Sequence, residues 1–369
     1  MNSRYRITPL SPPDRHAVHF YYDVCPESPD GRHAVFFAFD EPPAGEGRAK
    51  SGPGRAWVVE RDGRNARPLG ESVTGGSHDG SRTQWVDDRH IAYFDGKHGQ
   101  PRTVLVDIED GSRREIPGAL RMVSPAAPMG LTTLHDFDPD GVGLRDAVCT
   151  MNLLTGGLTP LFTVADALAL HPDHCTDFPG VEHMRFLHTK WSMDGRRFLV
   201  SCANLSSYTP AGQQGEKRGG LFVAEADGSG LRHVAAEGHH ICWGNDSETI
   251  MGFTHNPAGG QDLTAFRVSG GAPRAIIEQV HGKHATVNAA MTRVLADVTN
   301  AYGFPEKGYG GIYVYDVERK TPEVLAILCM PNSSHTGVHC HPAYSRDEKR
   351  VYFNAAEKGL RGVFALDLE

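Results

Sequence analysis

Histidine is frequent in this chain, at 20 of 369 residues, and four histidines share one sequence context. Each lies four residues before the first residue of a recurring turn of the Ser-Pro-Asp-Gly type; these are His188, His240, His284 and His341. Neutral imidazole is the commonest metal ligand among side chains near neutral pH. Imidazoles that converge with open coordination positions suit Zn²⁺, Mn²⁺, Fe²⁺, Ni²⁺ or Co²⁺. A single such histidine could simply satisfy backbone groups at a strand end, but four in one register favour a shared metal site.

The four histidines belong to a repeat that must position them. An apolar strand, a turn and a second apolar strand are followed by a loop and two further strands. Seven copies occur about 50 residues apart, and their turns begin at Ser28, Val86, Asp138, Ser192, Gly244, Asn288 and Ser345. Short alternating strands with turn chemistry between them are typical of propeller blades. The sequence therefore predicts an all-β fold, a seven-bladed β-propeller of four-stranded antiparallel blades.

The domain organisation follows from the same repeat. We expect residues 1–369 to form one propeller domain, because no linker-like stretch divides the copies; two separate β domains are the alternative. Helical periodicity is nearly absent, and only residues 164–170 predict a helical turn. The last copy ends with a third strand at residues 362–368. Its outer strand can come from residues 5–8 at the N-terminus, which would remove an open sheet edge.

The shared register places the histidines at the start of the innermost strand of each blade. Innermost strands line the central channel, and their starts crowd around one mouth of it. His339 shares the side of His341, because side chains alternate along a strand. The same register position in the first three copies holds Val24, Arg82 and Leu134. Further histidines lie just upstream of the later strands: His183, His239, His281 and His335.

Two segments that carry these histidines resemble the oligogalacturonate lyases. The segments are Gly238-His239-His240-Ile241-Cys242-Trp243 and His339-Cys340-His341-Pro342-Ala343-Tyr344-Ser345. The resemblance implies a seven-bladed polysaccharide lyase with a divalent metal ion at the axial mouth, Mn²⁺ first and Zn²⁺ as the alternative. The family's metal ligands fall at His240, His339 and His341, and His284 is the candidate fourth ligand.

The chain also departs from the family pattern. The family's ligand glutamine falls at Thr336, so His335 or His284 is expected to replace it. The family's base histidine falls at Ala203 and is missing. A more distant resemblance, carried by Tyr21-Tyr22 before the first turn, is to the ulvan lyases, which are also propellers. We therefore expect a related lyase whose substrate or base differs.

A lyase of this kind removes the proton next to a uronate carboxylate and expels the glycosidic oxygen from the neighbouring carbon. A divalent ion or an arginine stabilises the negative charge that develops. His188 is the preferred base, and Tyr208 is the second candidate or the donor to the leaving oxygen. Candidates for gripping substrate carboxylates are Arg185, Lys190, Arg82 and Lys283, with His183 and His335 as further substrate contacts. A solvated surface charge is the alternative for any single one of them.

Composition argues against several partners. The net charge is −8 and no basic run exceeds three residues, which argues against nucleic acid. No apolar run reaches the roughly 18 residues of a membrane span, and no signal-peptide pattern follows Met1, so we expect a cytoplasmic protein. The seven cysteines are scattered without a C-x-x-C pair, which suits reduced thiols. The expected partner is an acidic oligosaccharide.

Three other functions use the same architecture. One is a binding or scaffold propeller without chemistry, which needs no histidine ring. Another is the gate of a prolyl-oligopeptidase-type enzyme, which requires a hydrolase domain with a G-x-S-x-G motif that this sequence lacks. The third is a metal-dependent hydrolase or isomerase that acts on a small sugar in the same mouth, and the sequence leaves it open.

Overall fold

The polar turns of the repeat form as local hydrogen-bonded units, and the turn at Ser28 shows how. The hydroxyl of Ser28 donates to Asp30 Oδ1 at 2.6 Å. Gly31 takes a φ of +72°, a conformation that favours glycine. The same serine-to-aspartate bond recurs in the turns at Ser192, at 2.6 Å, and at Ser345, at 2.7 Å. Each turn reverses the chain between two apolar strands and so fixes the first hairpin of its blade.

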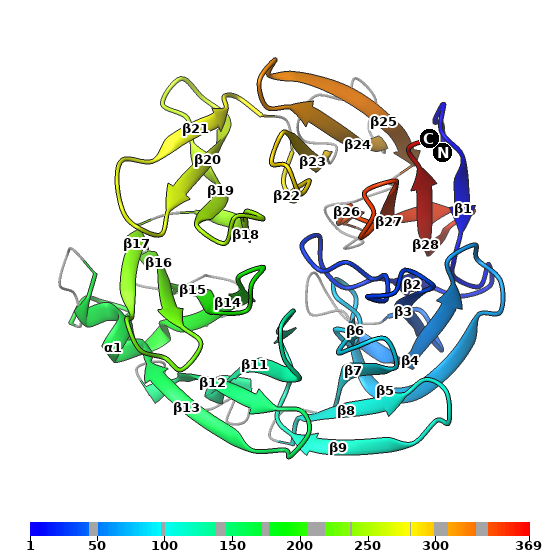
Figure 1. Cartoon of the computed structure of the whole chain (residues 1–369), viewed down its shortest axis with the longest axis horizontal. Helices are drawn as coiled ribbons and strands as arrows, with labels where there is room; N and C mark the ends of the chain where they lie inside the picture. The colour runs from blue at the N-terminus through cyan, green and yellow to red at the C-terminus, as the bar shows by residue number, and fades with distance from the viewer. Residues whose placement is uncertain are drawn as a thin grey trace.

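The computed structural model of the chain describes residues 1–43, 51–96, 100–136, 145–171, 177–204, 218–236, 238–280, 282–298, 309–329 and 339–369. Within them, seven four-stranded antiparallel sheets surround a central axis, as predicted (Figure 1). The first strand of each blade lies nearest the axis. We number the blades 1 to 7 in chain order.

The strands of the blades are as follows, from the innermost outward. Blade 1 contains β2 (Ala17–Val18), β3 (His33–Phe39), β4 (Ser51–Glu60) and β5 (Arg67–Gly76). Blade 2 contains β6 (Gln84–Trp85), β7 (His90–Asp95), β8 (Arg102–Asp107) and β9 (Arg113–Pro117). Blade 3 contains β10 (Met122–Val123), β11 (Met129–Thr133), β12 (Ala147–Asn152) and β13 (Leu158–Thr163). Blade 4 contains β14 (Arg185–Trp191), β15 (Arg197–Ala203), β16 (Gly219–Glu225) and β17 (Arg232–Ala235).

The remaining blades follow the same order. Blade 5 contains β18 (His239–Trp243), β19 (Thr249–His255), β20 (Gln261–Arg267) and β21 (Arg274–Ile277). Blade 6 contains β22 (Ala285–Val287), β23 (Arg293–Val298), β24 (Tyr309–Asp316) and β25 (Thr321–Cys329). Blade 7 contains β26 (Ala343–Tyr344), β27 (Arg350–Glu357), β28 (Leu360–Asp367) and β1 (Ile7–Pro9).

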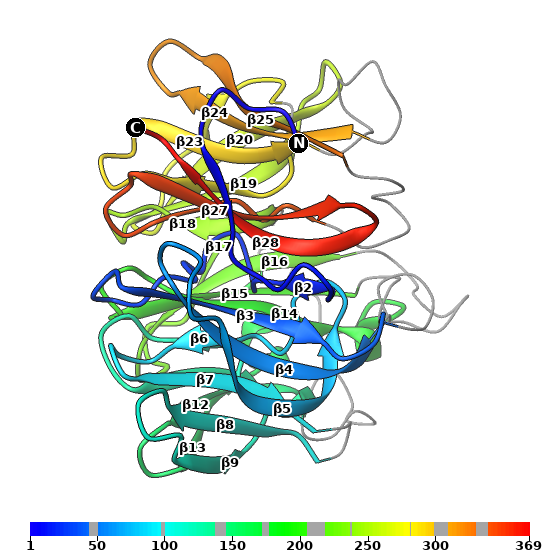
Figure 2. The ribbon, with the colours of Figure 1, turned by 90° about the vertical axis from the view of Figure 1, so that its right-hand side faces the viewer.

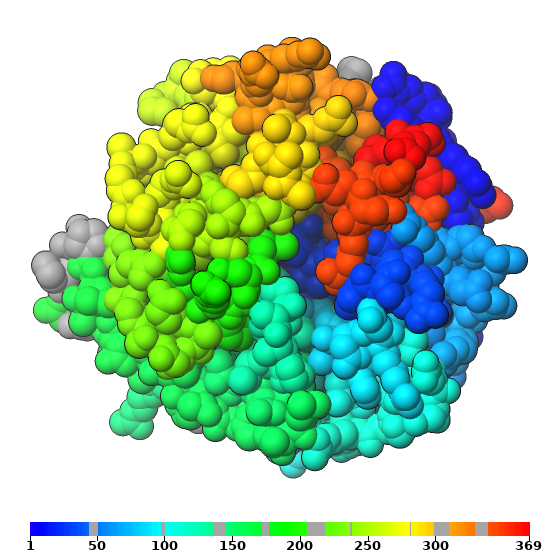
Figure 3. All heavy atoms as spheres, viewed as in Figure 1, coloured from blue at the N-terminus to red at the C-terminus, as the bar shows by residue number. Residues whose placement is uncertain are grey.

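The predicted closure of the ring by the N-terminus is confirmed. Strand β1 pairs antiparallel with β28, with Ile7 opposite Leu366 and Pro9 opposite Phe364. Figure 1 shows the blue β1 alongside the red β28, and Figure 2 shows both termini on the side of the ring that faces the viewer, apart from each other. The outer edge of β28 is therefore covered by a segment from the other end of the sequence. Seen with all atoms, the blades close around a narrow central hollow (Figure 3).

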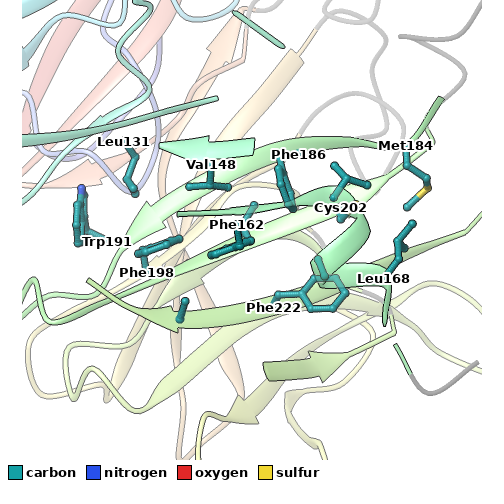
Figure 4. Close-up of a cluster of buried hydrophobic side chains, with 14 of the residues drawn as sticks. Leu131, Val148, Phe162, Leu168, Met184, Phe186, Trp191, Phe198, Cys202 and Phe222 are labelled. Atoms are coloured by element: carbon teal, nitrogen blue, oxygen red, sulfur yellow. The ribbon is translucent and has the colours of Figure 1, made fainter. Parts of the chain in front are cut away.

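The core lies between neighbouring blades, as at the junction of blades 3 and 4 (Figure 4). Phe162 of blade 3 stacks on Phe198 of blade 4 with ring centroids 5.8 Å apart, and Phe186 meets Phe162 edge to face at 5.6 Å. Burying one such side chain contributes roughly 1.5–3 kcal/mol. Packing of this kind holds the innermost strands in place around the axis.

Blade 3 corrects one detail of the predicted repeat. The stretch 138–141 was assigned to the turn after the innermost strand, with Leu134 in the histidine register. That stretch falls between β11 and β12, outside the described residues, and the innermost strand is β10. The true turn begins at Ser124, whose Oγ accepts from the backbone N–H of Ala126 at 3.3 Å. This turn lacks an Asp-Gly pair, so the search for Ser-Pro-Asp-Gly turns did not find it. The residue four positions before the turn, which corresponds to the histidines of the later blades, is therefore Leu120.

Helical structure is sparse. The predicted helical turn is α1 (Val164–Ala169), which begins with a capping box between Thr163 and Asp166. Two 3₁₀ segments, η2 (Leu134–Asp136) and η4 (Val181–His183), complete the helical elements in the described ranges. None of these helices has the length and apolar character that crossing a bilayer requires.

Candidate metal centre

Histidines from several blades meet at the axis, at the starts of the innermost strands. His188 and His240 lie in β14 and β18, whereas His284 immediately precedes β22 and His341 lies two residues before β26. Both β14 and β18 shift register where their histidine lies, between Phe186 and Thr189 and between His239 and Cys242. Such bulges re-aim side chains. The sequence register therefore marked the positions at which the inner strands bend toward the channel.

Four imidazoles form a close group: His78, His284, His339 and His341. One ring nitrogen of each lies within 4.8 Å of those of the others. Ligand atoms around a tetrahedral ion with bonds of about 2.1 Å are about 3.4 Å apart, so the four rings would move closer together by up to about 1.4 Å to bind one ion. We call these four residues the histidine cluster.

His284 is held in the orientation that metal-binding histidines adopt. Its Nδ1 atom lies 2.9 and 3.0 Å from the two carboxylate oxygens of Asp297, in β23, and its Nε2 atom lies 3.3 Å from Nδ1 of His339. Asp297 also accepts the backbone N–H groups of His284 and His341, each at 3.2 Å. A carboxylate behind the ring fixes the tautomer, with hydrogen on Nδ1 and the Nε2 lone pair directed into the cluster.

The buried Nε2 atom of His341 tests whether the residues present fit a metal. Its Nδ1 atom donates to the carbonyl oxygen of Phe20 at 3.0 Å, so Nε2 carries the lone pair. The side chain is fully buried, and Nε2 has no hydrogen-bond partner within the described part of the chain. A buried polar atom without a partner costs about 1–3 kcal/mol. A metal ion in the histidine cluster would satisfy it, so the residues present fit a metal.

Electrostatics keep the imidazoles neutral. Burial lowers the pKa of four rings, because an imidazolium there would lose its hydration: His188, His240, His339 and His341. The charge of Lys190 lowers the pKa of His188 further. Burial also raises the pKa of Asp297, an effect that the neighbouring imidazoles oppose. Neutral rings offer lone pairs to a metal ion or to a proton.

Two of these histidines adopt strained backbone conformations. His240 has a φ of +50° and His341 a φ of +45°, in the left-handed region that non-glycine residues rarely occupy. Such conformations cost about 1–3 kcal/mol each and cluster at functional sites. The rest of the fold therefore holds both rings against a local preference.

A pocket of about 240 Å³ adjoins the histidine cluster. His78, His188, His240 and His339 line it together with three cations, Arg82, Arg121 and Lys190. Asp23 and Asp79 also line the pocket, so its three cations exceed its carboxylates by one. It is large enough for a few water molecules or one sugar-sized group, and its cations suit an anionic ligand.

The cations are anchored by the pocket wall. Lys190 Nζ lies 2.6 Å from Asp23 Oδ2, and above the rings of Tyr22 and Tyr21, at 4.5 and 4.8 Å from their centroids. Arg82 Nε lies 3.3 Å from a carboxylate oxygen of Asp79. This packing orders the charged groups before any ligand arrives.

The two arginines that line the pocket also donate hydrogen bonds to the next blade along the chain. Arg82 Nη1 donates to the carbonyl of Leu120 at 3.2 Å, and Arg121 Nη1 donates to that of Leu187 at 2.7 Å.

The predicted site residues divide into three groups. Those that line the pocket or belong to the histidine cluster are Arg82, His188, Lys190, His240, His284, His339 and His341. Arg185, Lys283 and His183 are not among the residues that line the pocket. Arg185 instead donates to the carbonyls of Glu182 and Met184, at 2.9 and 2.8 Å, and His183 lies beside Glu182. Tyr208 and His335 lie outside the described residues.

Sequence reasoning missed His78 and Arg121. His78 lies in the loop that leads from β5 to β6, outside the histidine register, yet its ring centroid is 4.3 Å from His339 and 4.6 Å from His341. A signal existed, because His78 lies four residues before Arg82, just upstream of an innermost strand like His183. Arg121 immediately precedes β10 and was hidden by the misassigned third turn.

His240 lies beside the histidine cluster. Its ring centroid is 4.5 Å from that of His284, and it lines the pocket, but its nitrogens are not among the four that lie within 4.8 Å of one another. Its predicted role as a metal ligand stays a prediction.

Solved structures with a similar fold include two lyases. Oligogalacturonate lyase from Vibrio parahaemolyticus is 13% identical, with a TM-score of 0.69 over 100% of this chain and 95% of that chain. An oligogalacturonate lyase in complex with manganese is 14% identical, also with a TM-score of 0.69, over 100% of this chain and 94% of that chain. The tricorn protease is 12% identical, with a TM-score of 0.55 over 94% of this chain and 33% of that chain.

At these identities the likeness shows a shared propeller fold and nothing finer. No family model matches the chain, and no curated protein matches it by sequence.

Proposed function

We propose that this protein is a metal-dependent lyase that cleaves uronate-containing oligosaccharides by β-elimination. The observation that carries the proposal is the unpartnered, buried Nε2 atom of His341, which belongs to a cluster of neutral imidazoles beside a cation-lined pocket. The similarity in fold to two oligogalacturonate lyases, one of them solved with manganese, supports the same chemistry.

We assign the ion to the histidine cluster. The chemistry that a bound divalent ion supplies here is stabilisation of the charge that develops on a uronate carboxylate as the neighbouring proton leaves. Four neutral imidazoles do not offset the charge of such an ion, and Asp297 offsets only part of it. The centre is therefore suited to an anionic group. Mn²⁺ follows from the sequence resemblance, and Zn²⁺ is the alternative.

The proton-transfer role falls to an imidazole that lines the pocket without belonging to the cluster. His188 fits this description: its ring centroid lies 5.9 Å from that of Tyr21, and the ring is neutral because of burial and the nearby Lys190. A neutral imidazole can accept a proton from a substrate held against the cluster. His240, whose ring lies beside His284 and which also lines the pocket, is the second candidate for this role.

The cations would orient the substrate. Arg82, Arg121 and Lys190 come from three consecutive blades and line one pocket with the cluster. A chain of uronates carries one carboxylate per sugar, so one carboxylate can face the cluster while another meets these cations. This arrangement favours an acidic oligosaccharide over a neutral one.

The test is an assay of purified protein with a panel of uronate oligosaccharides. β-Elimination creates an unsaturated uronate that absorbs in the ultraviolet, and we expect this signal to require a divalent ion. New reducing ends without the ultraviolet signal would identify a hydrolase at the same site. Stoichiometric metal without any turnover across the panel would leave a binding propeller.

A further inference from the structure

His78 is presented to the cluster by a loop that is closed on itself. Gly76 and Gly80 exchange two backbone hydrogen bonds, of 2.9 and 2.8 Å, and His78 lies at the tip between them. A Cβ atom on Gly80 would lie 2.7 Å from Cβ of Phe37, and Gly80 has a φ of +56°. The loop therefore requires glycine where it closes.

A second anchor comes from the opposite end of the sequence. Arg361, in β28 of blade 7, is buried and donates from Nη1 to the carbonyl oxygen of Ser77, next to His78. Two independent contacts thus fix the backbone on either side of this histidine.

Among the described residues, three carboxylates that contact the cluster or line the pocket already have partners. Asp297 accepts from His284 Nδ1 and from two backbone N–H groups. Asp23 pairs with Lys190, and Asp79 with Arg82. Of the described residues that bring a ligand atom into the group, all four are histidines.

We infer that His78 is the fourth protein ligand of the metal ion, and that the donor set is four neutral imidazoles. Imidazole nitrogen suits Zn²⁺, Ni²⁺ and Co²⁺, whereas Mn²⁺, Mg²⁺ and Ca²⁺ prefer oxygen ligands. We therefore expect this donor set to bind Zn²⁺, Ni²⁺ and Co²⁺ more tightly than Mn²⁺, Mg²⁺ and Ca²⁺, which departs from the Mn²⁺ that the sequence resemblance implies. The inference rests on the proposed metal-dependent function and sharpens the identity of the ion.

The experiment compares metal binding by wild type, His78→Ala, His78→Gln and His284→Ala, after chelator treatment and with Co²⁺, Zn²⁺ and Mn²⁺ separately. Losing a residue that only supports a metal ligand typically lowers metal affinity by at least about tenfold. Because we infer that His78 is itself a ligand, we expect His78→Ala to lower Zn²⁺ affinity by more than that. The visible spectrum of the bound Co²⁺ should change with it. In His78→Gln, which offers an amide oxygen, Zn²⁺ affinity should fall more than Mn²⁺ affinity.

Controls separate the outcomes. His255→Ala alters an exposed histidine at the end of β19 and should leave affinity and spectrum unchanged. Thermal unfolding of each variant reports on folding, and His78→Gln replaces His78→Ala if the latter fails to fold. Unchanged affinity and Co²⁺ spectrum in both His78 variants, with metal lost in His284→Ala, would overturn this inference and leave the proposed function intact. Absence of metal binding by wild type would overturn both.

Discussion

The two carboxylate oxygens of Asp297 lie 2.9 and 3.0 Å from Nδ1 of His284, and both side chains are fully buried. Asp297 pairs with His284 on one side and binds the backbone N–H of His341 on the other, so one carboxylate orders two members of the cluster. The first prediction concerns this contact. Asp297→Asn keeps the shape but loses the charge that fixes the His284 tautomer, and we expect metal affinity to fall about 10- to 100-fold.

The measurement for Asp297→Asn is a competition titration with a chelator of known affinity. Asp110→Asn, at an exposed turn of blade 2, is the matched control. Equal affinity in the two variants would show that the carboxylate does not support the ion.

The second prediction separates the proton acceptor from the ligands. His188→Ala should lower kcat by roughly 10²- to 10⁴-fold, the usual contribution of a general base, while one ion per chain remains bound. His240→Ala should also lower turnover and retain its ion, because its nitrogens lie outside the group of four. Elemental analysis of both variants checks this. Loss of the ion from either one would move that residue into the ligand set.

The third prediction tests whether Arg361 positions His78. Burial lowers the pKa of Arg361 to about 10, and its guanidinium reaches Ser77 from blade 7. Arg361→Met should weaken metal binding by about tenfold through loss of this anchor, whereas Arg361→Lys, which keeps a donor, should recover part of it. A change in thermal stability with no change in metal affinity would assign Arg361 a purely structural role.

The fourth prediction concerns ring closure. Deleting residues 1–9 removes β1 and uncovers β28, including Phe364 and Leu366. Each large apolar side chain exposed costs roughly 1.5–3 kcal/mol, so stability should fall by several kcal/mol and the free edge should promote aggregation. Denaturant unfolding and light scattering measure the two effects. Arg4→Ala, which removes exposed contacts with Glu323 and Tyr5 but keeps β1, should reproduce neither; wild-type stability in the deletion would contradict the account.

The sequence predicted features that depend on local chemistry. The turn at Ser192 is held mainly by bonds among neighbouring residues, from Ser192 Oγ to Asp194 and from the backbone N–H of Arg197 to Ser192 Oγ, so the register four residues before it correctly placed His188 on an innermost strand. Site residues whose position depends on contacts with distant segments of the chain were not predicted. His78 joins the cluster because blades 1 and 7 meet when the ring closes. Its position upstream of Arg82 indicated the mouth of the channel, but not its distance from the other three histidines.

The hydrogen-bond and ion-pair partners of the candidate residues were not predicted for the same reason. Lys190 was predicted from its type alone, and the structure shows it buried against Asp23, 167 residues away along the chain. Arg185, which was also predicted to bind a carboxylate, instead donates hydrogen bonds to the carbonyls of Glu182 and Met184. The sequence identified positively charged residues as candidates. Only the fold showed that Lys190 lines the pocket and that Arg185 is hydrogen-bonded to nearby backbone carbonyls.

The central claim is that imidazoles from separate blades hold one divalent ion at the axis. Anomalous diffraction from crystals grown with Zn²⁺ or Co²⁺ tests it most directly. The account predicts one anomalous peak about 2.0–2.1 Å from nitrogens of His78, His284, His339 and His341. A peak elsewhere, or no peak with the four rings still apart, would contradict it.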